Sequence, residues 1–200
     1  MKNTKLIAGV LMLFVSFSTY GAALGQPKRT SMLGYGIGAA LVSVDDSAGS
    51  TEATWALQPI TLVYTARVWS SSLRYWSELY YYKTMLDASS TKIGQDVERY
   101  GVRLSFQKNL KILPKFSAWF GAGLDISQEK FTARHTVDGD GFLIKAYPDR
   151  EGANVAGLIN VVSEWSLPRN WIIAAKLEQS IPSDGHITES LAAVTLLYRY

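Results

Sequence analysis

Apolar and polar residues alternate one by one along most of this chain. The stretch YGVRLSFQ at residues 100–107 is an example, because every second residue is apolar or aromatic and those between are small, polar or charged. Successive side chains of a β-strand point to opposite faces, so a period of two predicts a strand with one apolar and one mixed face. After the first 25 residues we find no helical period. The sequence therefore predicts an all-β fold.

Eight stretches share this alternation. They lie at residues 34–44, 60–67, 73–82, 100–107, 116–127, 154–165, 171–178 and 190–200. Pro59 precedes the second stretch and cannot donate a ladder hydrogen bond, so that strand should begin after Pro59 or carry a bulge there. The connections alternate in length. Short ones are expected at 68–72, 108–115 and 166–170, and longer, more polar ones at 44–54, 83–96, 128–152 and 180–186.

The first residues have the pattern of a secretory leader. Met1–Lys5 carries two lysines, Leu6–Phe17 is almost wholly apolar, and small residues follow. This order is typical of a signal peptide, and the apolar run is short for a transmembrane helix. We predict a signal peptide over residues 1–23, with cleavage after Ala23 or Gly25, and a single domain over 24–200. An N-terminal membrane anchor is the alternative.

Charge and cysteine content narrow the class further. The chain has 20 Lys and Arg against 17 Asp and Glu, and two of the lysines belong to the leader, so the remainder is nearly neutral. A nucleic-acid-binding protein would have a clear basic excess. There is no cysteine, which excludes a lipid-modified lipoprotein and a disulfide framework.

Two architectures use alternating strands of this kind. A soluble sandwich or lipocalin-like barrel has the apolar face inside, whereas a membrane barrel has apolar residues facing lipid and polar or small residues facing the lumen. The mixed faces here are rich in Gly and Ser with single charges of both signs, which suits a narrow barrel interior. Aromatic residues lie near the expected strand ends, where rings favour the membrane–water interface. These are Trp69, Phe116, Trp165, Trp171, Tyr198 and Tyr200. Together with the alternating connections, they favour the membrane barrel.

The last stretch, Ala192–Tyr200, resembles the C-terminal strand of bacterial outer-membrane barrels, which ends on an aromatic residue after alternating apolar positions. The chain is similar to the small OmpX-, OmpW- and OmpA-barrel-like proteins. The resemblance implies an eight-stranded antiparallel up-and-down transmembrane β-barrel, monomeric, in the outer membrane of a Gram-negative bacterium. It also implies that the barrel-assembly machinery reads Tyr198 and Tyr200 during biogenesis, and that the other partners are outer-membrane lipid and lipopolysaccharide.

Strand parity predicts which charged residues face the lumen. They are Arg67, Arg74, Glu78, Arg103, Asp125, Glu164, Lys176, Glu178 and Arg199. Buried charges must be paired, because isolated ones cost several kcal/mol each. We therefore expect a network of ion pairs that closes the lumen, and a role in envelope structure, surface interaction or adhesion. A small channel for hydrophobic solutes is the alternative. It would need an apolar pocket in the outer half, which Trp76, Tyr80 and Trp119 on the inner face leave open.

A catalytic site is not expected. Some small outer-membrane barrels resemble hydrolases or acyltransferases with a His and a Ser, but His186 and Ser190 would lie roughly 13 Å apart on a strand, and His135 has no such partner. The glycines at 34, 36 and 38 lie within a strand, so they are not a dinucleotide-binding loop. We expect no cofactor and no metal site.

The longest connection, around 128–152, contains DGDG between two alternating stretches, which predicts a hairpin. The strands on either side of it should therefore project beyond the membrane as a ribbon. Basic residues on this and a neighbouring loop are candidates for contacts with lipopolysaccharide phosphates, with ordinary solvated loop charge as the alternative. They are Lys83, Lys92, Lys130, Arg134, Lys145 and Arg150.

Overall fold

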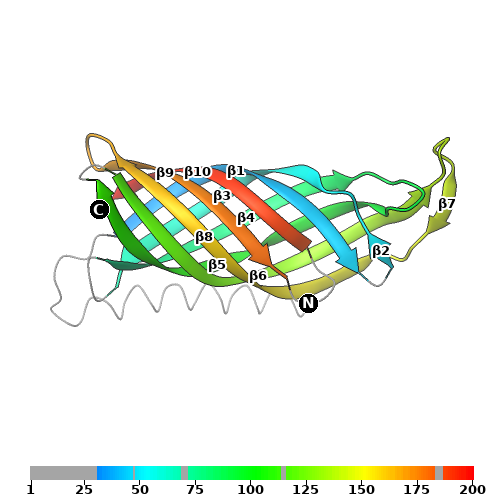
Figure 1. The fold of residues 1–200 in the computed structure, drawn as a ribbon, viewed down its shortest axis with the longest axis horizontal. Helices are drawn as coiled ribbons and strands as arrows, with labels where there is room; N and C mark the ends of the chain where they lie inside the picture. Colours follow the sequence, from blue (N-terminus) through cyan, green and yellow to red (C-terminus); the bar gives the residue numbers. More distant parts are fainter. Residues whose placement is uncertain (1–30, 47, 69–71, 114–115, 183–186) are drawn as a thin grey trace.

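The computed structural model describes residues 31–46, 48–68, 72–113, 116–182 and 187–200. Within these ranges, eight long strands form one closed antiparallel barrel (Figure 1). The barrel strands are β1 (Ser31–Asp46), β3 (Thr54–Arg67), β4 (Leu73–Leu86), β5 (Gly94–Leu113), β6 (Phe116–Val137), β8 (Arg150–Ser166), β9 (Trp171–Ile181) and β10 (Ile187–Arg199). Each strand pairs with its neighbour along the barrel, and β10 pairs with β1 from Ile187 to Arg199 to close it. The predicted all-β, up-and-down barrel is confirmed, while the expected signal peptide lies outside the described residues.

The two ends of the barrel differ. At one end, which we call the turn end, lie the chain's last residue and the short β3–β4 and β8–β9 connections. At the other, which we call the loop end, lie two further short strands, β2 (Gly49–Ser50) and β7 (Leu143–Ala146). β7 pairs with residues 135–137 at the loop end of β6, and the two form a ribbon that projects beyond the rest of the barrel (Figure 1). The hairpin and ribbon predicted around 128–152 are confirmed.

Two strand boundaries differ from the expectation. Residues 108–113 belong to β5 instead of a turn, because the alternation continues: Lys108 and Leu110 are exposed on the outside of the wall. β3 begins at Thr54, before Pro59. Its pairing with β1 shifts between Gly36 and Gly38, where two residues of β3, Pro59 and Ile60, oppose one of β1. Of the two alternatives for Pro59, the bulge is correct.

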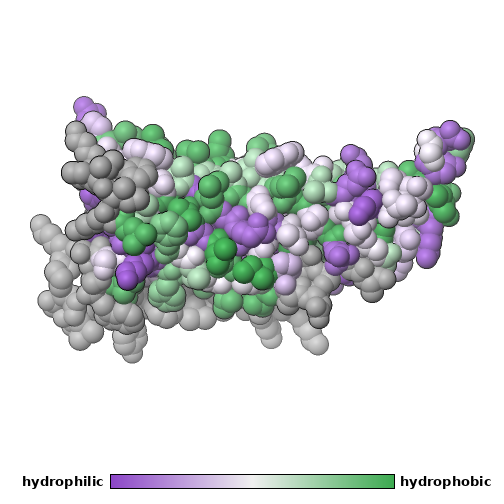
Figure 2. Space-filling model, viewed as in Figure 1, coloured by the Kyte–Doolittle hydropathy of each residue, from purple (hydrophilic) through white to green (hydrophobic). Residues whose placement is uncertain are grey.

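The outside of the wall is apolar. Large hydrophobic side chains are exposed on every barrel strand, including Ile37 on β1, Leu62 on β3, Leu124 on β6 and Leu177 on β9. Figure 2 shows such side chains spread over much of the wall. A soluble barrel would bury these residues, so their exposure is the arrangement of a barrel whose solvent is lipid. No helix within the described ranges is long and apolar enough to span a bilayer.

Aromatic side chains gather at the turn end. The rings of Trp171 and Tyr198 meet edge to face, 5.1 Å apart at their centroids, and Trp165, which pairs with Ile173, and Tyr200 are also exposed at this end. The backbone N–H of Tyr200 donates to the carbonyl of Ser31 at 3.2 Å, which extends the closing pair of strands to its last residue. These rings are placed as an interfacial girdle would be. Trp69 and the side chain of Phe116 lie outside the described residues.

Candidate functional site

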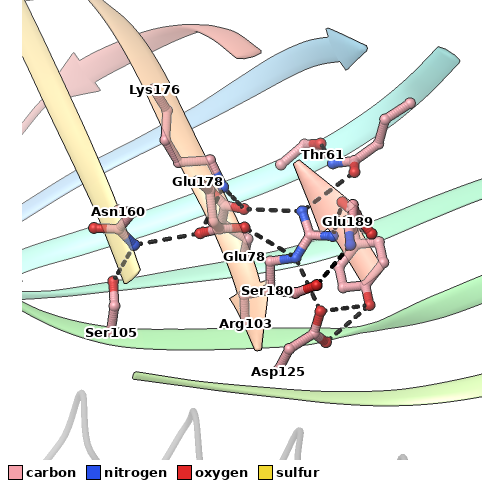
Figure 3. A network of polar contacts seen from close by, with 12 residues as sticks. Thr61, Glu78, Arg103, Ser105, Asp125, Asn160, Lys176, Glu178, Ser180 and Glu189 are labelled. Carbon is pink, nitrogen blue, oxygen red and sulfur yellow. Dashed lines mark hydrogen bonds and ion pairs between the residues drawn. The ribbon is translucent and has the colours of Figure 1, made fainter. Parts of the chain in front are cut away.

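The centre of the lumen is organised around Arg103 of β5. Its guanidinium lies 2.5 Å from Glu189 Oε1 and 3.2 Å from both Asp125 Oδ2 and Glu178 Oε1, with Glu78 Oε2 at 3.9 Å. Figure 3 shows these carboxylates converging on Arg103 from strands around the barrel. The side chain of Arg103 is only 3% exposed. A buried charge of this kind is tolerated because opposite charges surround it.

A second arginine, Arg99, lies further toward the loop end on the same face of β5. Its Nη1 is 2.6 Å from Glu189 Oε2, its Nη2 is 3.2 Å from Asp125 Oδ2, and its Nε is 3.3 Å from Glu129 Oε1. Glu189 and Asp125 are thus shared by Arg99 and Arg103. Because each carboxylate joins two guanidinium groups, the pairs form one connected network.

Lys176 of β9 and two tyrosines of β4 complete this network. Lys176 Nζ lies 2.6 Å from Glu78 Oε2 and 3.1 Å from Glu178 Oε2. The Tyr80 hydroxyl donates to Asp125 at 2.8 Å, and its ring lies 3.8 Å beneath the Arg103 guanidinium. The Tyr82 hydroxyl donates to Glu189 Oε2 at 3.2 Å. The inner faces of five different strands therefore meet across the lumen.

The central network contains more acidic than basic groups. Its cations are Arg99, Arg103 and Lys176, and its carboxylates are Glu78, Asp125, Glu129, Glu178 and Glu189. Neutral donors make up part of the difference. Trp76 Nε1 donates to Glu78, Asn154 to Glu129 and Asn160 to Glu178. The central network therefore contains more carboxyl groups than cations, and each named carboxyl group accepts a hydrogen bond from a neutral donor.

A second cluster lies nearer the turn end, and Gln107 and Asn160 link it to the central network by hydrogen bonds. Arg74 forms an ion pair with Glu164 and donates from Nε to Gln107 at 2.6 Å. Its guanidinium lies 3.9 Å from the Trp119 ring and 4.8 Å from the Trp76 ring, and Trp119 Nε1 donates to Glu164 at 3.1 Å. Stacking between two indoles favours the charged guanidinium where water is excluded.

Apolar side chains fill the lumen on both sides of the central network. The cluster nearer the turn end combines Met32, Val63, Trp76, Trp119, Val162, Ile172, Ala174 and Leu197. The other cluster includes Val42, Val44, Leu86, Val97, Phe131 and Ile187, all 0–2% exposed. Loop residues cover it: Thr51 and Ile93 are buried, and the N–H of Ile93 donates to the carbonyl of Ser50 at 3.1 Å. The inner aromatic residues Trp76, Tyr80 and Trp119 are buried, and each of them lies against an arginine of the lumen.

Seven of the nine residues assigned to the lumen by parity take part in these two clusters. They are Arg74, Glu78, Arg103, Asp125, Glu164, Lys176 and Glu178. Arg67 and Arg199 are half-buried at the turn end and form no ion pair with another described residue. Sequence reasoning missed Arg99, Glu129 and Glu189. Each continues the inward parity of its strand, one or two residues beyond the stretch that the alternation defined.

The six basic residues proposed to contact lipopolysaccharide do not form one patch. Lys83 and Lys130 are exposed on the outside of the wall. Lys92 Nζ donates to Ser50 Oγ at 2.7 Å. Lys145 and Arg150 lie against the rings of Tyr147 and Phe131, at 4.7 and 4.3 Å.

Arg134 is buried within the ribbon, where it donates to Gln95 Oε1 and to the carbonyl of Pro148, both at 3.0 Å. It points inward because Ala133 has a positive φ of 54° and two residues of β6, Ala133 and Arg134, oppose Gln95 alone on β5. The bulge changes the strand's parity at that point.

Lys83 and Lys130 belong to a row of alternating charges across four strands. Lys83 of β4 pairs in register with Glu98 of β5, Glu98 with Lys130 of β6, and Lys130 with Glu151 of β8. Opposite charges at directly paired positions are the favourable arrangement on a sheet face. This charge row lies on the outside of the wall, between the apolar band and the ribbon.

The histidine and serine considered for catalysis are not brought together. His135 Nδ1 lies 2.6 Å from the carbonyl of Ala133 on the ribbon. Ser190 faces outward and its hydroxyl donates to Gln179 Oε1 at 2.5 Å. His186 lies outside the described residues. Within the described ranges, no group of three or more His, Asp or Glu side chains is placed to hold a metal ion.

Comparison with known proteins adds to this geometry. No family model matches the sequence, and no curated protein matches it. Solved structures resemble its fold. Neisserial surface protein A (NspA) aligns over 87% of this chain and 100% of its own, with a TM-score of 0.58 and 12% identity. The outer membrane protein OprG from Pseudomonas aeruginosa covers 86% and 96%, with a TM-score of 0.57 and 9% identity.

The attachment invasion locus protein Ail of Yersinia pestis is similar to the same extent. It covers 85% of this chain and 99% of its own, with a TM-score of 0.53 and 14% identity. At identities this low, the likeness concerns the fold alone. The described chain has the fold of the small eight-stranded outer-membrane β-barrels.

Proposed function

We propose that this chain is an integral outer-membrane protein of a Gram-negative bacterium, whose closed barrel passes no solute and holds the loop-end ribbon at the cell surface. The apolar exterior of the wall, with its aromatic girdle, supports membrane insertion. One observation carries the closed state: Arg103, at the centre of the lumen, is surrounded by four carboxylates and is 3% exposed. No catalytic role is assigned to any residue.

Surface roles occur among solved barrels of this fold. One is described as a surface protein and another as an attachment invasion locus protein. In the present chain, the ribbon of β6 and β7 is the part that reaches furthest from the wall (Figure 1). It is therefore the natural place for contact with a partner outside the cell.

The closed state is tested by conductance in planar lipid bilayers, with the purified full-length protein. We expect no resolved single-channel steps. Arg103→Ala removes the cation that four carboxylates share, so water should enter the lumen and small conductance steps should appear. Arg67→Ala changes a half-buried residue at the turn end and should give no conductance steps. Large steps in the wild-type protein would contradict the closed barrel and favour a channel. Membrane insertion is tested separately, by outer-membrane fractionation and by a gel mobility that changes on boiling.

We also propose that two of the six basic residues, Lys83 and Lys130, contact lipopolysaccharide. Lys83 and Lys130 face outward from the charge row, and the Lys83 side chain is 60% exposed, so lipid phosphates could reach both. Arg134 is buried in hydrogen bonds to Gln95 and Pro148 and cannot serve without unfolding the ribbon.

Binding to immobilised lipopolysaccharide provides the test. Lys83→Glu with Lys130→Glu should weaken binding about tenfold, as expected for two lost phosphate contacts of 0.2–1 kcal/mol each or more. Lys108→Glu makes the same charge change on the outside of β5, nearer the turn end, and should have no effect. Equal loss in both variants would indicate a general charge effect and remove this proposal.

A further inference from the structure

Three arginines lie on one side of the lumen at the turn end. Arg67 of β3 and Arg74 of β4 are directly paired, so they share the inner face on which Arg74 is buried. Arg199 of β10 pairs with Met32, which is buried on the inner face of β1. Because β10, β1, β3 and β4 are consecutive neighbours in the wall, the three cations lie close to one another.

Few acidic residues lie at this end to balance these charges. Glu164 is the only acidic residue of the chain segments there, which are residues 31–36, 62–75, 105–122, 160–175 and 195–200. Its ion pair is with Arg74. Arg67 and Arg199 form no ion pair with another described residue, so these two cations have no carboxylate partner among the described side chains.

The direct pairing of two arginines is unfavourable without an anion. Like charges at directly opposed positions of an antiparallel pair destabilise a sheet, whereas opposite charges stabilise it. Arg67 and Arg74 are a like-charged pair of this kind, and Arg74 is 1% exposed, so water screens the repulsion poorly. An anion bound between the two groups would replace their repulsion by attraction to a common partner.

Two buried guanidinium nitrogens at this end also lack an acceptor among the described residues. Arg74 donates from Nε to Gln107 and pairs through Nη1 with Glu164, but its Nη2 has no hydrogen-bond partner. The buried Nε of Arg199 has none either. Most buried polar atoms in proteins are hydrogen-bonded, so two such donors near each other indicate a place for an acceptor from outside the chain. Planar guanidinium donors suit the oxygens of phosphate.

The additional carboxyl groups of the central network do not supply this acceptor. They accept hydrogen bonds within that network, and among the described residues none of them pairs with Arg67 or Arg199. Their charge offsets part of the repulsion at the turn end, by an amount that falls with distance. A distant charge does not accept a hydrogen bond from a buried N–H.

The spacing of the strands suits a group of the size of phosphate. Arg199 lies opposite Met32, Met32 lies opposite Thr65, and Arg67 is two residues further along β3 on the same face. Two strand spacings and two residues place the Cα atoms of Arg199 and Arg67 roughly 12 Å apart. Two long side chains can meet across that distance on one oxyanion. Both are half-buried, so they remain accessible from the turn end.

We propose that Arg67, Arg74 and Arg199 bind a doubly charged phosphate group, free or as a monoester, at the turn end of the lumen. Arg67 and Arg199 contact it from the open side, and Arg74 donates to it from the buried side. Two cations without a carboxylate partner match the charge of a phosphate monoester, whereas the phosphate diester of a lipid headgroup carries a single charge. This end is the periplasmic one in outer-membrane barrels, and the inference depends neither on the ribbon nor on a closed lumen.

The test uses the full-length protein in alkyl maltoside micelles, which contain no phosphate. Arginine is labelled with ¹⁵N, and the Nε–H signals of Arg67, Arg74 and Arg199 are followed by NMR during titration with methyl phosphate. We expect saturable shifts of these signals, and none when sodium chloride is added to the same ionic strength. Dimethyl phosphate, the matched diester with a single charge, should bind about tenfold more weakly.

Three variants make the test specific. Arg67→Gln and Arg199→Gln should each weaken binding of methyl phosphate about tenfold, because each removes a charge-assisted contact. Lys108→Gln is the matched control, since Lys108 pairs with Leu73, beside Arg74, but lies on the outside of the wall. It should bind methyl phosphate as the wild-type protein does.

Urea unfolding gives a second readout that a folding defect would not produce. Arg67→Gln removes the like charge opposite Arg74, so without phosphate its unfolding midpoint should equal or exceed that of the wild-type protein. Methyl phosphate should raise the midpoints of the wild-type protein and Lys108→Gln, because a ligand of the folded state stabilises it, and should have little effect on Arg67→Gln.

Several outcomes would overturn the proposal: no saturable shift with methyl phosphate, equal shifts with chloride, or an equal loss of binding in Lys108→Gln and Arg67→Gln. A response to micelles that contain phosphatidylglycerol, with none to methyl phosphate, would assign the site to a lipid headgroup and would also overturn it. Bilayer conductance tests the closed barrel separately, since a silent barrel that binds no methyl phosphate contradicts the phosphate site alone.

Discussion

Arg103 of β5 and Glu189 of β10 meet across the lumen with 2.5 Å between Nη2 and Oε1, although they lie 86 residues apart in the sequence. Glu189 also lies 2.6 Å from Arg99, so one carboxylate of the last strand contacts the guanidinium groups of both Arg99 and Arg103 on β5. The barrel wall is closed by backbone pairing, and this shared carboxylate links the last strand to β5 across its interior.

Glu189→Gln should therefore destabilise the barrel by about 3 kcal/mol or more, because two buried arginines lose their common negative partner. The measurement is urea unfolding of the protein refolded into lipid vesicles. Thr188→Ala changes the neighbouring, outward-facing residue and should be nearly neutral. Equal stability of Glu189→Gln and the wild-type protein would mean that the network contributes little.

Arg74 should be sensitive to the shape of its side chain as well as its charge. Arg74→Lys retains the charge but loses the planar stacking on Trp119 and the donation from Nε to Gln107, so we expect a loss of about 1–2 kcal/mol. Tryptophan fluorescence should shift to the red if water reaches Trp76 and Trp119. An unshifted spectrum with wild-type stability would contradict the stacking role.

Gly123 on β6 lies where two strands approach closely. A Cβ at this position would meet the carbonyl oxygen of Leu104 and, at 2.6 Å, the Cα of Ser105, both of which are backbone. Gly123→Ala should therefore lower the yield of folded, heat-modifiable protein. Gly152→Ala is the matched control, because nothing lies within 4 Å of the added carbon there. A normal yield of Gly123→Ala would show that the strands can separate without cost.

Two apolar side chains of similar exposure, one on the wall and one beside the ribbon, should respond differently to substitution by arginine. Leu177 on β9 is 65% exposed and Phe142 beside β7 is 71% exposed, but only Leu177 lies on the wall. Leu177→Arg should cost about 2–4 kcal/mol, as a cation facing the middle of the bilayer does. Phe142→Arg should leave the free energy of unfolding unchanged within about 0.5 kcal/mol. Similar costs for both would place the wall in water.

The alternation of the sequence was sufficient to place Arg103 and Asp125 on the inner face, because side-chain parity follows from a period of two. It could not identify their partners. Whether Arg103 meets Glu178, Glu189 or Glu164 depends on how far each strand is staggered against the next. Shifting a strand by an even number of residues leaves the same side chains on the inner face, so the alternation cannot distinguish these registers. Arg99, Glu129 and Glu189 were missed because their strands continue past the polar residues that seemed to end them.

Arg134 illustrates a different limit of sequence reasoning. It was assigned to the surface with the other loop cations, but a single bulge at Ala133 turns it into the ribbon, against Gln95 and Pro148. Nothing in the local sequence marks that bulge, since alanine rarely adopts a positive φ. Lys83 and Lys130 retained the assigned outward position because their strands run without irregularity there.

The pairing of β1 with β10 has a consequence for how quickly this molecule can fold. Met32 and Arg199 lie side by side in the wall yet near opposite ends of the described chain, so bringing them together carries the largest loop-closure entropy of any contact in the barrel. Every other strand pair joins neighbours along the chain or nearly so. The seam between β1 and β10 should therefore form last, because it must close the longest loop of the chain.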